Sequence, residues 1–276
     1  MTMIENRVAE HYTNGGLEAA IEAGWAKLRS DTDATLIDQL AGVDEFHIGG
    51  RSATEMVCMA MDLAPGLMVL DIGCGLGGSA RFMATRFGVE VEGIDLTTEY
   101  VDVGNALTRA VDLDAKVQLR QASALDLPQA ASSFDRASLI HVGMNIADKQ
   151  RLFAEIVRVL KPGGMLAVFD VMRVGEGALE YPVAWAADET TSFVAPVQEY
   201  ETAIKRAGLT VQLVEPKKDM GMEFFKRMKA RMAESGPPPL GLHIVMGSDA
   251  GVKAANMAAN IANGIIAPVL MIACKP

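Results

Sequence analysis

The sequence has little that would bind nucleic acid or cross a membrane. Acidic residues outnumber basic ones by 35 to 25, the formal net charge is -10, and no Lys/Arg cluster is long enough to follow a phosphate backbone. Charge, Gly or Pro interrupts the apolar runs well short of the ~20 residues of a membrane span. The N-terminus, MTMIENRVAEHY, offers no apolar signal-peptide core. We therefore expect a cytoplasmic protein with no membrane span and no nucleic-acid partner.

Cysteines and aromatic residues are also scarce. The three cysteines, Cys58, Cys74 and Cys274, are widely spaced in apolar neighbourhoods, whereas a disulfide framework or a metal site would need paired spacings. We expect reduced core thiols and no metal. The aromatic content is 5%, but 17 methionines and a hydrophobic content of 50% are ample for a sizeable core.

The most informative stretch is VLDIGCGLGG, residues 69–78. Its apolar start is typical of a strand buried on both faces, and it contains Asp71 and glycines at Gly73, Gly75 and Gly77. The following SARFMATRFG has apolar residues at helical spacing. A strand should turn sharply into a helix here, with the bare amides of the first helical turn facing a small ligand. Such glycines alone are weak evidence for the kind of ligand bound, because dinucleotide sites use a similar pattern.

A second acid follows at the end of the next expected strand. In RFGVEVEGIDL, Val89 to Ile94 form this strand, and Asp95 lies 24 residues after Asp71. That interval fits one helix and two short connections in a parallel strand–helix–strand unit. A carboxylate there would accept hydrogen bonds from ribose hydroxyls, and its charge disfavours NADP. The alternative is that Asp95 merely caps the next helix.

The rest of the chain continues the alternation of strands and helices. KVQLRQASALDLP and SSFDRASLIHVG predict a third and a fourth strand, and IADKQRLFAEIVRVLKPGGMLAVFDVM predicts a helix, a turn and a fifth strand. The helical spacing of apolar residues in 1–45 predicts helices there. Residues 173–200 lose their periodicity, as an inserted lid would. The chain closes with an apolar strand in which Pro268 suggests an edge position or a bulge.

Four of these motifs together, VLDIGCGLGG, the acid in EGIDL, SALDLP and RVLKPGG, resemble those of the class I S-adenosylmethionine-dependent methyltransferases. HIGG, GGSARFMATRFGV and the closing GIIAPVLMIACKP are similar to the small-molecule branch. That branch includes sarcosine and dimethylglycine N-methyltransferases and quinone and tocopherol methyltransferases. The resemblance implies an α/β, Rossmann-like, seven-stranded, mostly parallel sheet with helices on both faces. We expect a helical cap at 1–64 and a methyltransferase domain at 65–276 with a lid at about 173–200.

The resemblance also implies which residues hold the cofactor. Asp71 and the glycines would receive its methionine end, Asp95 the ribose, and Leu96 would pack beside the adenine. The loop at 123–125 would border the adenine edge, where the commoner family pattern has Asp at the position of Ser123. The full set of expected cofactor residues is Asp71, Gly73, Gly75, Gly77, Asp95, Leu96, Ser123, Ala124, Leu125 and His141.

Residues after the fourth strand are expected near the transferable methyl group. His141 is the candidate general base, since an imidazole with a pKa of ~6.5 suits neutral pH. The alternative is that His141 only orients a ligand, because methyl transfer to a neutral amine needs no base.

The substrate-binding candidates are His47, Arg51, Met144, Asn145, Arg173 and Trp185. Other aromatic residues of the two lid-like regions are Tyr12, Trp25, Tyr181, Phe193 and Tyr200.

The function predicted is methyl transfer from S-adenosylmethionine to a small-molecule acceptor, leaving S-adenosylhomocysteine. An amine of the glycine, sarcosine or dimethylglycine type is the first choice, with Arg51 and Arg173 as anchors for its carboxylate. C- or O-methylation of a quinone or phenolic ring, which needs a longer apolar slot, is the second. A NAD-dependent oxidoreductase and a non-catalytic cofactor-binding protein stay as alternatives of other classes. The oligomeric state stays open, a homodimer included.

Overall fold

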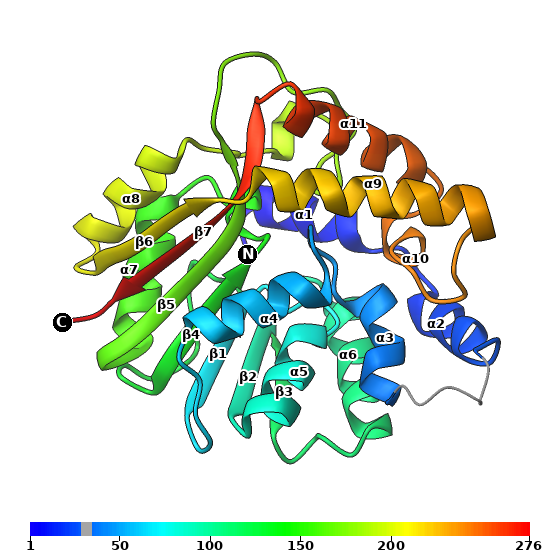
Figure 1. The fold of residues 1–276 in the computed structure, drawn as a ribbon. Helices are drawn as coiled ribbons and strands as arrows, with labels where there is room; N and C mark the ends of the chain where they lie inside the picture. The colour runs from blue at the N-terminus through cyan, green and yellow to red at the C-terminus, as the bar shows by residue number, and fades with distance from the viewer. Residues whose placement is uncertain (29–34) are drawn as a thin grey trace.

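A seven-stranded sheet forms the centre of the computed structural model, which describes residues 1–28 and 35–276. The strands lie in the order β3-β2-β1-β4-β5-β7-β6 (Figure 1). Strands β1 to β5 pair in parallel, and β7 runs antiparallel to both β5 and β6. The predicted Rossmann-like, mostly parallel sheet is therefore confirmed. The strands are β1 (Met68–Ile72), β2 (Glu90–Asp95), β3 (Val117–Gln121), β4 (Phe134–Ile140), β5 (Leu160–Arg173), β6 (Thr210–Pro216) and β7 (Ile266–Cys274).

Helices cover both faces of the sheet. On one face α7 and α8 place Phe153 and Ile204 in a core cluster with Ile72, and on the other α4 and α5 pack with Val69. Among the described residues, no helix combines the length and the apolar character that crossing a membrane requires. The helices are α1 (Met3–Tyr12), α2 (Leu17–Trp25), α3 (Leu36–Asp44), α4 (Arg51–Ala60), α5 (Gly78–Phe87), α6 (Thr98–Ala110), α7 (Lys149–Val159), α8 (Val197–Arg206), α9 (Lys218–Ser235), α10 (His243–Met246) and α11 (Ala250–Ala262).

Helix α7 shows how local sequence produces this packing. Asp148 precedes it, and the Asp148 side chain accepts a 2.9 Å hydrogen bond from the amide of Arg151, which caps the first turn. Leu152, Phe153 and Ile156 then recur on one face of the helix and are fully buried. Burying each such side chain contributes about 1.5–3 kcal/mol, so the amphipathic pattern fixes the face that docks on the sheet.

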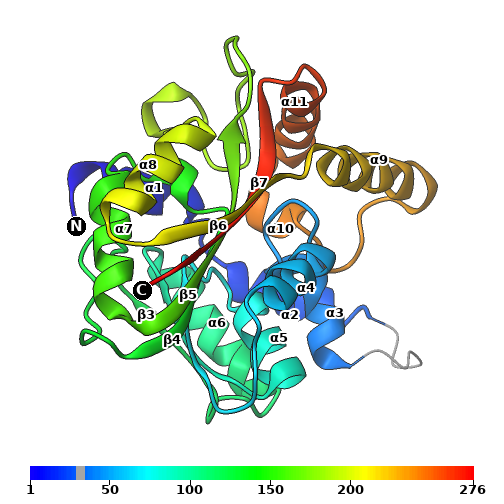
Figure 2. The same ribbon diagram turned by 60° about the vertical axis from the view of Figure 1, so that its left-hand side comes forward.

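Two further groups of helices extend beyond the sheet, and α9 and α11 of the second group also contact β7. Helices α1 to α3 come from the N-terminal part of the chain, and α9 to α11 come from residues 217–264 between β6 and β7. Helices α9 and α11 lie side by side in both views (Figure 2). Helix α10 contacts α2 and α3, and Leu17 and Leu40 share a buried cluster with Leu240 and Val245. The two groups therefore pack against each other.

Strand β7 corrects the interpretation of Pro268. This residue was expected at a sheet edge or bulge, yet β7 lies between β5 and β6 and Pro268 pairs with Val171 of β5. The pairing of β6 with β7 ends at Pro216 and Val269, and the amide of Lys217 then donates a 2.7 Å hydrogen bond to the Pro268 carbonyl. The nitrogen and carbonyl of one strand residue face the same neighbour. The missing N–H of Pro268 therefore faces the point where β6 has ended, and the sheet loses no hydrogen bond.

Candidate functional site

The glycine turn after β1 is held open by its own backbone. The amides of Gly73 and Cys74 both donate to the carbonyl of Ile94 in β2, at 2.8 and 2.9 Å. Gly73 has a φ of +70°, and a Cβ there would lie 2.2 Å from Cγ2 of Val142. Gly75 has a φ of +53°, but a Cβ there would meet nothing closer than Tyr100, at 3.9 Å. Only glycine suits the first position, and the second faces open space that a ligand can fill.

Asp95 connects this turn to the end of β2. Its Oδ2 accepts a 3.0 Å hydrogen bond from the amide of Gly75, and its Oδ1 accepts a 2.8 Å hydrogen bond from the amide of Thr97. Burial raises the pKa of Asp95, and these backbone hydrogen bonds act against the rise. Each carboxylate oxygen keeps a further lone pair, so Asp95 can accept two hydroxyl groups from a ligand in the cavity.

Asp71 lies in β1, just before the turn, and is 2% exposed. Its Oδ1 accepts a 2.7 Å hydrogen bond from the hydroxyl of Ser138, its register partner in β4, while its Oδ2 is buried without a partner. Burial raises the pKa of Asp71 to about 7, although the Ser138 hydrogen bond lowers it. An unpartnered buried acceptor of this kind indicates that a donor group of a ligand belongs beside it.

A single cavity of about 400 Å³ extends from this edge of the sheet to the helices that stand away from it. The glycine turn, Asp71 and Asp95 line one part of it. Another part is lined by apolar side chains from the loop before α4, the turn after β4, α9 and α11. These include Ile48, Met144, Phe224, Phe225, Met228 and Met257. The cavity therefore combines a polar end with an apolar one, as sites for small organic ligands do.

His141 borders the cavity directly after β4 and has a left-handed backbone, with a φ of +54°. Its Nδ1 lies 3.2 Å from the carbonyl of Phe169 in β5, and its Nε2 lies 3.3 Å from the amide of Ile48. The carbonyl can only accept and the amide can only donate, so these contacts assign the proton to Nδ1 and the lone pair to Nε2. Burial, with neighbouring His47, lowers the pKa of His141 to about 3. The imidazole is thus neutral, and both of its nitrogens are engaged.

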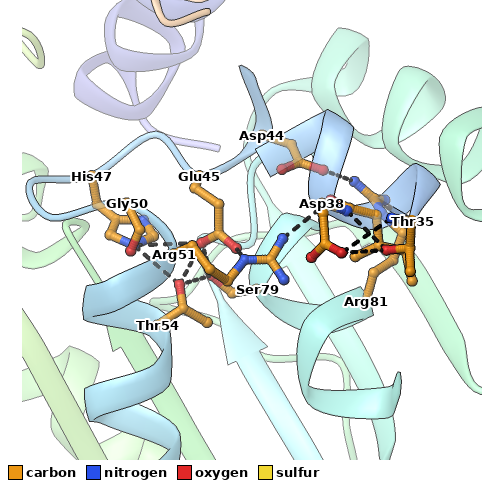
Figure 3. A network of polar contacts seen from close by, with 11 residues as sticks. Thr35, Asp38, Asp44, Glu45, His47, Gly50, Arg51, Thr54, Ser79 and Arg81 are labelled. Carbon is orange, nitrogen blue, oxygen red and sulfur yellow. Dashed lines mark hydrogen bonds and ion pairs between the residues drawn. The ribbon is translucent and has the colours of Figure 1, made fainter. Parts of the chain in front are cut away.

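A buried polar network lies beside the cavity (Figure 3). The guanidinium Nε of Arg51 lies 2.8 Å from Oε1 of Glu45, whose side chain is fully buried. Thr54 also donates to Glu45, and the Arg51 guanidinium lies 4.4 Å above the ring of Phe82. His47 contributes Nε2, which lies 3.1 Å from the hydroxyl of Thr54. The network ties α4 to the residues before it, and it holds the charge of Arg51 away from the cavity.

The comparisons with known proteins agree on one family. A family model described as "Methyltransferase domain" matches residues 70–168. The 27-O-demethylrifamycin SV methyltransferase of Amycolatopsis mediterranei (strain S699) is 32% identical over 200 residues, which cover 67% of this chain and 73% of that protein. The chain belongs to the class I S-adenosylmethionine-dependent methyltransferases. S-adenosylmethionine is the methyl donor of this family, so the alternative of a NAD-dependent oxidoreductase is set aside.

Other relatives match only part of their own length. The methyltransferase GfsG of Streptomyces halstedii is 31% identical over 61% of this chain and 62% of that protein. The chain spans 38% of phosphoethanolamine N-methyltransferase 1 of Arabidopsis thaliana and 33% of the 2-methyl-6-phytyl-1,4-hydroquinone methyltransferase of Synechocystis. A solved geranyl diphosphate methyltransferase in complex with GPP and sinefungin has a TM-score of 0.73 with complete coverage of both chains. At 18% identity, that likeness shows the fold.

The site of this methyltransferase fits its family's cofactor. The open backbone at Gly75 and the unpartnered oxygen of Asp71 suit the amino-acid end of S-adenosylmethionine, and the free lone pairs of Asp95 suit the ribose hydroxyls. Leu96 and Leu125 add an apolar border for the base. The free acceptors of Asp71 and Asp95 therefore match two groups of hydrogen-bond donors on the cofactor, its ammonium group and its ribose hydroxyls.

Most of the predicted site residues of the methyltransferase meet at this cavity. Those that line it are Asp71, Gly73, Gly75, Asp95, Leu96, Ala124, Leu125, His141, His47, Met144, Asn145 and Trp185. Four do not: Gly77, Ser123, Arg51 and Arg173. Gly77 directly precedes α5 with a φ of +80°, and a Cβ there would lie 2.8 Å from Cδ1 of Leu119, so this glycine allows close packing. Arg173 donates a 2.7 Å hydrogen bond to the carbonyl of Gly177, outside the cavity.

The expected lid at 173–200 contributes only Ala184 and Trp185 to the lining. Of the aromatic residues expected in the two lid-like regions, Tyr12 and Trp185 reach the cavity, whereas Trp25, Tyr181, Phe193 and Tyr200 do not. Tyr200 instead donates a 2.7 Å hydrogen bond to Oδ2 of buried Asp170. The cover of the cavity comes mainly from other segments.

Apart from Tyr12, sequence reasoning missed the lining residues that α1, α9 and α11 supply, among them Glu5, Phe224 and Met257. The amphipathic pattern of MEFFKRMKARMAES was visible, with Phe224 and Met228 four residues apart on one helical face. That pattern shows a face that must be covered, but it does not show that the face covers a ligand cavity.

Proposed function

We propose that the protein methylates a neutral, largely apolar acceptor with a hydroxylated ring, by C- or O-methylation of a quinone-type or phenolic compound. The observation that carries the proposal is the scarcity of positive charge around the acceptor end of the cavity. Among the described lining residues, Arg151 is the one Lys or Arg, and its Nε donates a 2.6 Å hydrogen bond to the carbonyl of Leu125 at the opposite, cofactor end.

An acceptor of the glycine, sarcosine or dimethylglycine type carries a carboxylate, which needs a cation or several donors when it is buried. The two arginines expected to serve it are engaged elsewhere, Arg51 with Glu45 and Arg173 with a backbone carbonyl. The amine, our first expectation from the sequence, therefore gives way to the ring acceptor. The names of the rifamycin and hydroquinone relatives above are in line with this choice.

The polar groups at the acceptor end are few and uncharged. Nδ2 of Asn145 donates a 3.0 Å hydrogen bond to the Tyr12 hydroxyl, and Oδ1 of Asn145 is buried without a partner. An amide oxygen in this state is suited to accept a hydrogen bond from a ring hydroxyl. We assign Asn145 the orientation of the acceptor, and the apolar side chains of α9 and α11 its binding energy.

His141 acts in this proposal as a positioning residue. Its Nε2 lone pair already accepts the amide of Ile48, and a pKa near 3 makes it a weak base at neutral pH. Holding the acceptor next to the donor's methyl group in line supplies most of the rate by proximity. The ring hydroxyl would release its proton to water, and the resulting anionic ring oxygen or carbon would take the methyl group as the carbon–sulfur bond of the sulfonium breaks. The apolar walls favour this transfer, because the two opposite charges disappear in it.

Incubation with labelled S-adenosylmethionine and a panel of acceptors tests the proposal. We expect label in alkylated hydroquinones or phenols and none in glycine, sarcosine, dimethylglycine or phosphoethanolamine. The variant Phe224→Ala should raise KM for the accepted ring compound about tenfold with little change in kcat, because it removes binding common to ground and transition states. Met232→Ala, an exposed change on the same helix, is the control. Label confined to an amine would overturn the proposal.

A further inference from the structure

The far end of the cavity lies beyond Asp95, over the loop that follows β3. The sheet order β3-β2-β1 places three features in a row along the carboxyl edge: this loop, Asp95 and the glycine turn. With the ribose at Asp95, the two ends of the cofactor extend in opposite directions, one toward the glycine turn and the other toward the β3 loop. The amino-acid end lies at the glycine turn, so the adenine extends toward the β3 loop. Leu96, Ala124 and Leu125 line the loop side. The adenine therefore belongs next to residues 122–125.

A carboxylate from a distant part of the sequence reaches this end. Glu5 lies in α1, is 9% exposed and lines the cavity. It accepts a hydrogen bond from the hydroxyl of Ser123 and another, of 2.5 Å, from the amide of Thr2. The Ser123 hydroxyl in turn accepts a 3.0 Å hydrogen bond from the amide of Leu125. Ser123, in the loop, thus fixes the position of the Glu5 carboxylate.

We infer that Glu5 of the N-terminal helix recognises the exocyclic amine of the cofactor's adenine. A carboxylate only accepts hydrogen bonds, and the adenine amine only donates them. The nearby carbonyl of Leu125 already accepts from Arg151, so it competes poorly for the amine. A hypoxanthine ring has a carbonyl oxygen at the same position, which the carboxylate repels. Glu5 therefore makes the site specific for an adenosyl ligand.

This inference rests on the family's cofactor and not on the identity of the acceptor, so it is tested by binding alone. Calorimetry at neutral pH would compare S-adenosylhomocysteine with its S-inosyl analogue. We expect wild-type protein to prefer the adenosyl compound at least tenfold, because a site built around a donor rejects a ligand that lacks it. In Glu5→Gln the amide can also donate to the hypoxanthine oxygen, so the preference should shrink several-fold or reverse.

Two control variants separate recognition from simple loosening of α1. Glu10→Gln removes the same charge from an exposed position of the same helix and should keep the wild-type preference. Thr2→Ala removes the hydroxyl that caps the helix but leaves the carboxylate, so it should weaken both ligands by the same factor. The inference is overturned if Glu5→Gln leaves the adenosyl-to-inosyl ratio at its wild-type value, whatever happens to the affinities themselves.

Discussion

Nη2 of Arg81 lies 2.6 Å from Oδ2 of Asp44, and neither side chain has any exposed surface. Asp44 ends α3, and Arg81 lies in the first turns of α5, so the pair joins the N-terminal helices to the helix that follows the glycine turn. Arg81 also donates a 2.9 Å hydrogen bond to the hydroxyl of Thr108 in α6. One guanidinium thus holds three helices around the cofactor end of the cavity.

Breaking this pair should destabilise the protein strongly. Asp44→Asn leaves the Arg81 charge buried without its partner, which costs about 3–5 kcal/mol. Urea unfolding followed by circular dichroism would measure the free energy of unfolding. The control is Glu201→Gln, which breaks the exposed ion pair of Glu201 with Lys205 and should cost under about 1 kcal/mol. Equal small losses in the two variants would contradict the role given to the buried pair.

Removal of the Asp95 carboxylate should weaken cofactor binding. Asp95→Ala loses the two acceptors assigned to the ribose hydroxyls, and charge-assisted hydrogen bonds contribute about 1.5–3 kcal/mol each. We expect the Kd for S-adenosylhomocysteine to rise by at least about 100-fold in calorimetry. Asp102→Ala, an exposed change in α6, is the matched control. An unchanged Kd in Asp95→Ala would show that the ribose lies elsewhere.

Asp71 should make cofactor binding depend on pH. Its pKa is raised to about 7 by burial, so its carboxylate is mostly charged at pH 8 and mostly protonated at pH 6. If its free oxygen accepts a hydrogen bond from the ammonium group of the cofactor, the affinity for S-adenosylhomocysteine increases as the pH is raised. The increase is up to about tenfold per pH unit below pH 7 and levels off above it. Asp71→Asn should bind more weakly and show no such slope between pH 6 and 8. A wild-type slope that survives in Asp71→Asn would assign the titration to another group.

His47 should lower the stability of the protein in acid. Burial lowers its pKa to about 4, against 6.5 for the free group, so below pH 6.5 the unfolded chain takes up a proton that the folded protein does not. The free energy of unfolding therefore falls by about 1.4 kcal/mol per pH unit between pH 6.5 and 4 on account of His47. Other groups titrate there too, so the measured quantity is a difference between proteins.

His47→Gln isolates this contribution, because the side chain keeps hydrogen-bonding atoms but does not titrate. Between pH 7 and 5 the stability of wild-type protein should fall by about 2 kcal/mol more than that of His47→Gln, in urea unfolding at each pH. His243→Gln, a change at an exposed histidine, should follow the wild-type curve. Parallel curves for wild type and His47→Gln would refute the expectation.

The cofactor end of the site was predictable because its information is local. The strand, the glycine turn and the acid at Asp95 lie within 27 residues, from 69 to 95, and their spacing alone fixes the parallel unit that brings them together. Gly73 and Gly75 are needed by backbone geometry, which a sequence shows directly. The five parallel strands follow from the same kind of alternation, repeated along the chain, whereas the seven-stranded sheet was an implication of the family resemblance.

The acceptor end was not predictable because it depends on contacts between distant segments. Asn145 and Tyr12, which share a hydrogen bond there, are 133 positions apart, and neither residue type alone suggests the pairing. Arg51 follows HIGG and Arg173 ends β5, and these positions suggested that both anchor a ligand. Instead, Arg51 forms an ion pair with Glu45, and Arg173 donates a hydrogen bond to the carbonyl of Gly177. Such competition between partners is decided by packing in three dimensions.

The position of β7 has a consequence for how the chain is made. The last strand of the chain lies between β5 and β6, and it is their shared neighbour. A nascent or truncated chain that lacks residues 266–274 therefore leaves two further strand edges unpaired, one on β5 and one on β6, and such edges recruit other chains. Strand β7 also contacts α9 and α11, so the acceptor pocket forms only with β7 in place. Placement of β7, rather than formation of the cofactor half, therefore closes both the sheet and the acceptor pocket.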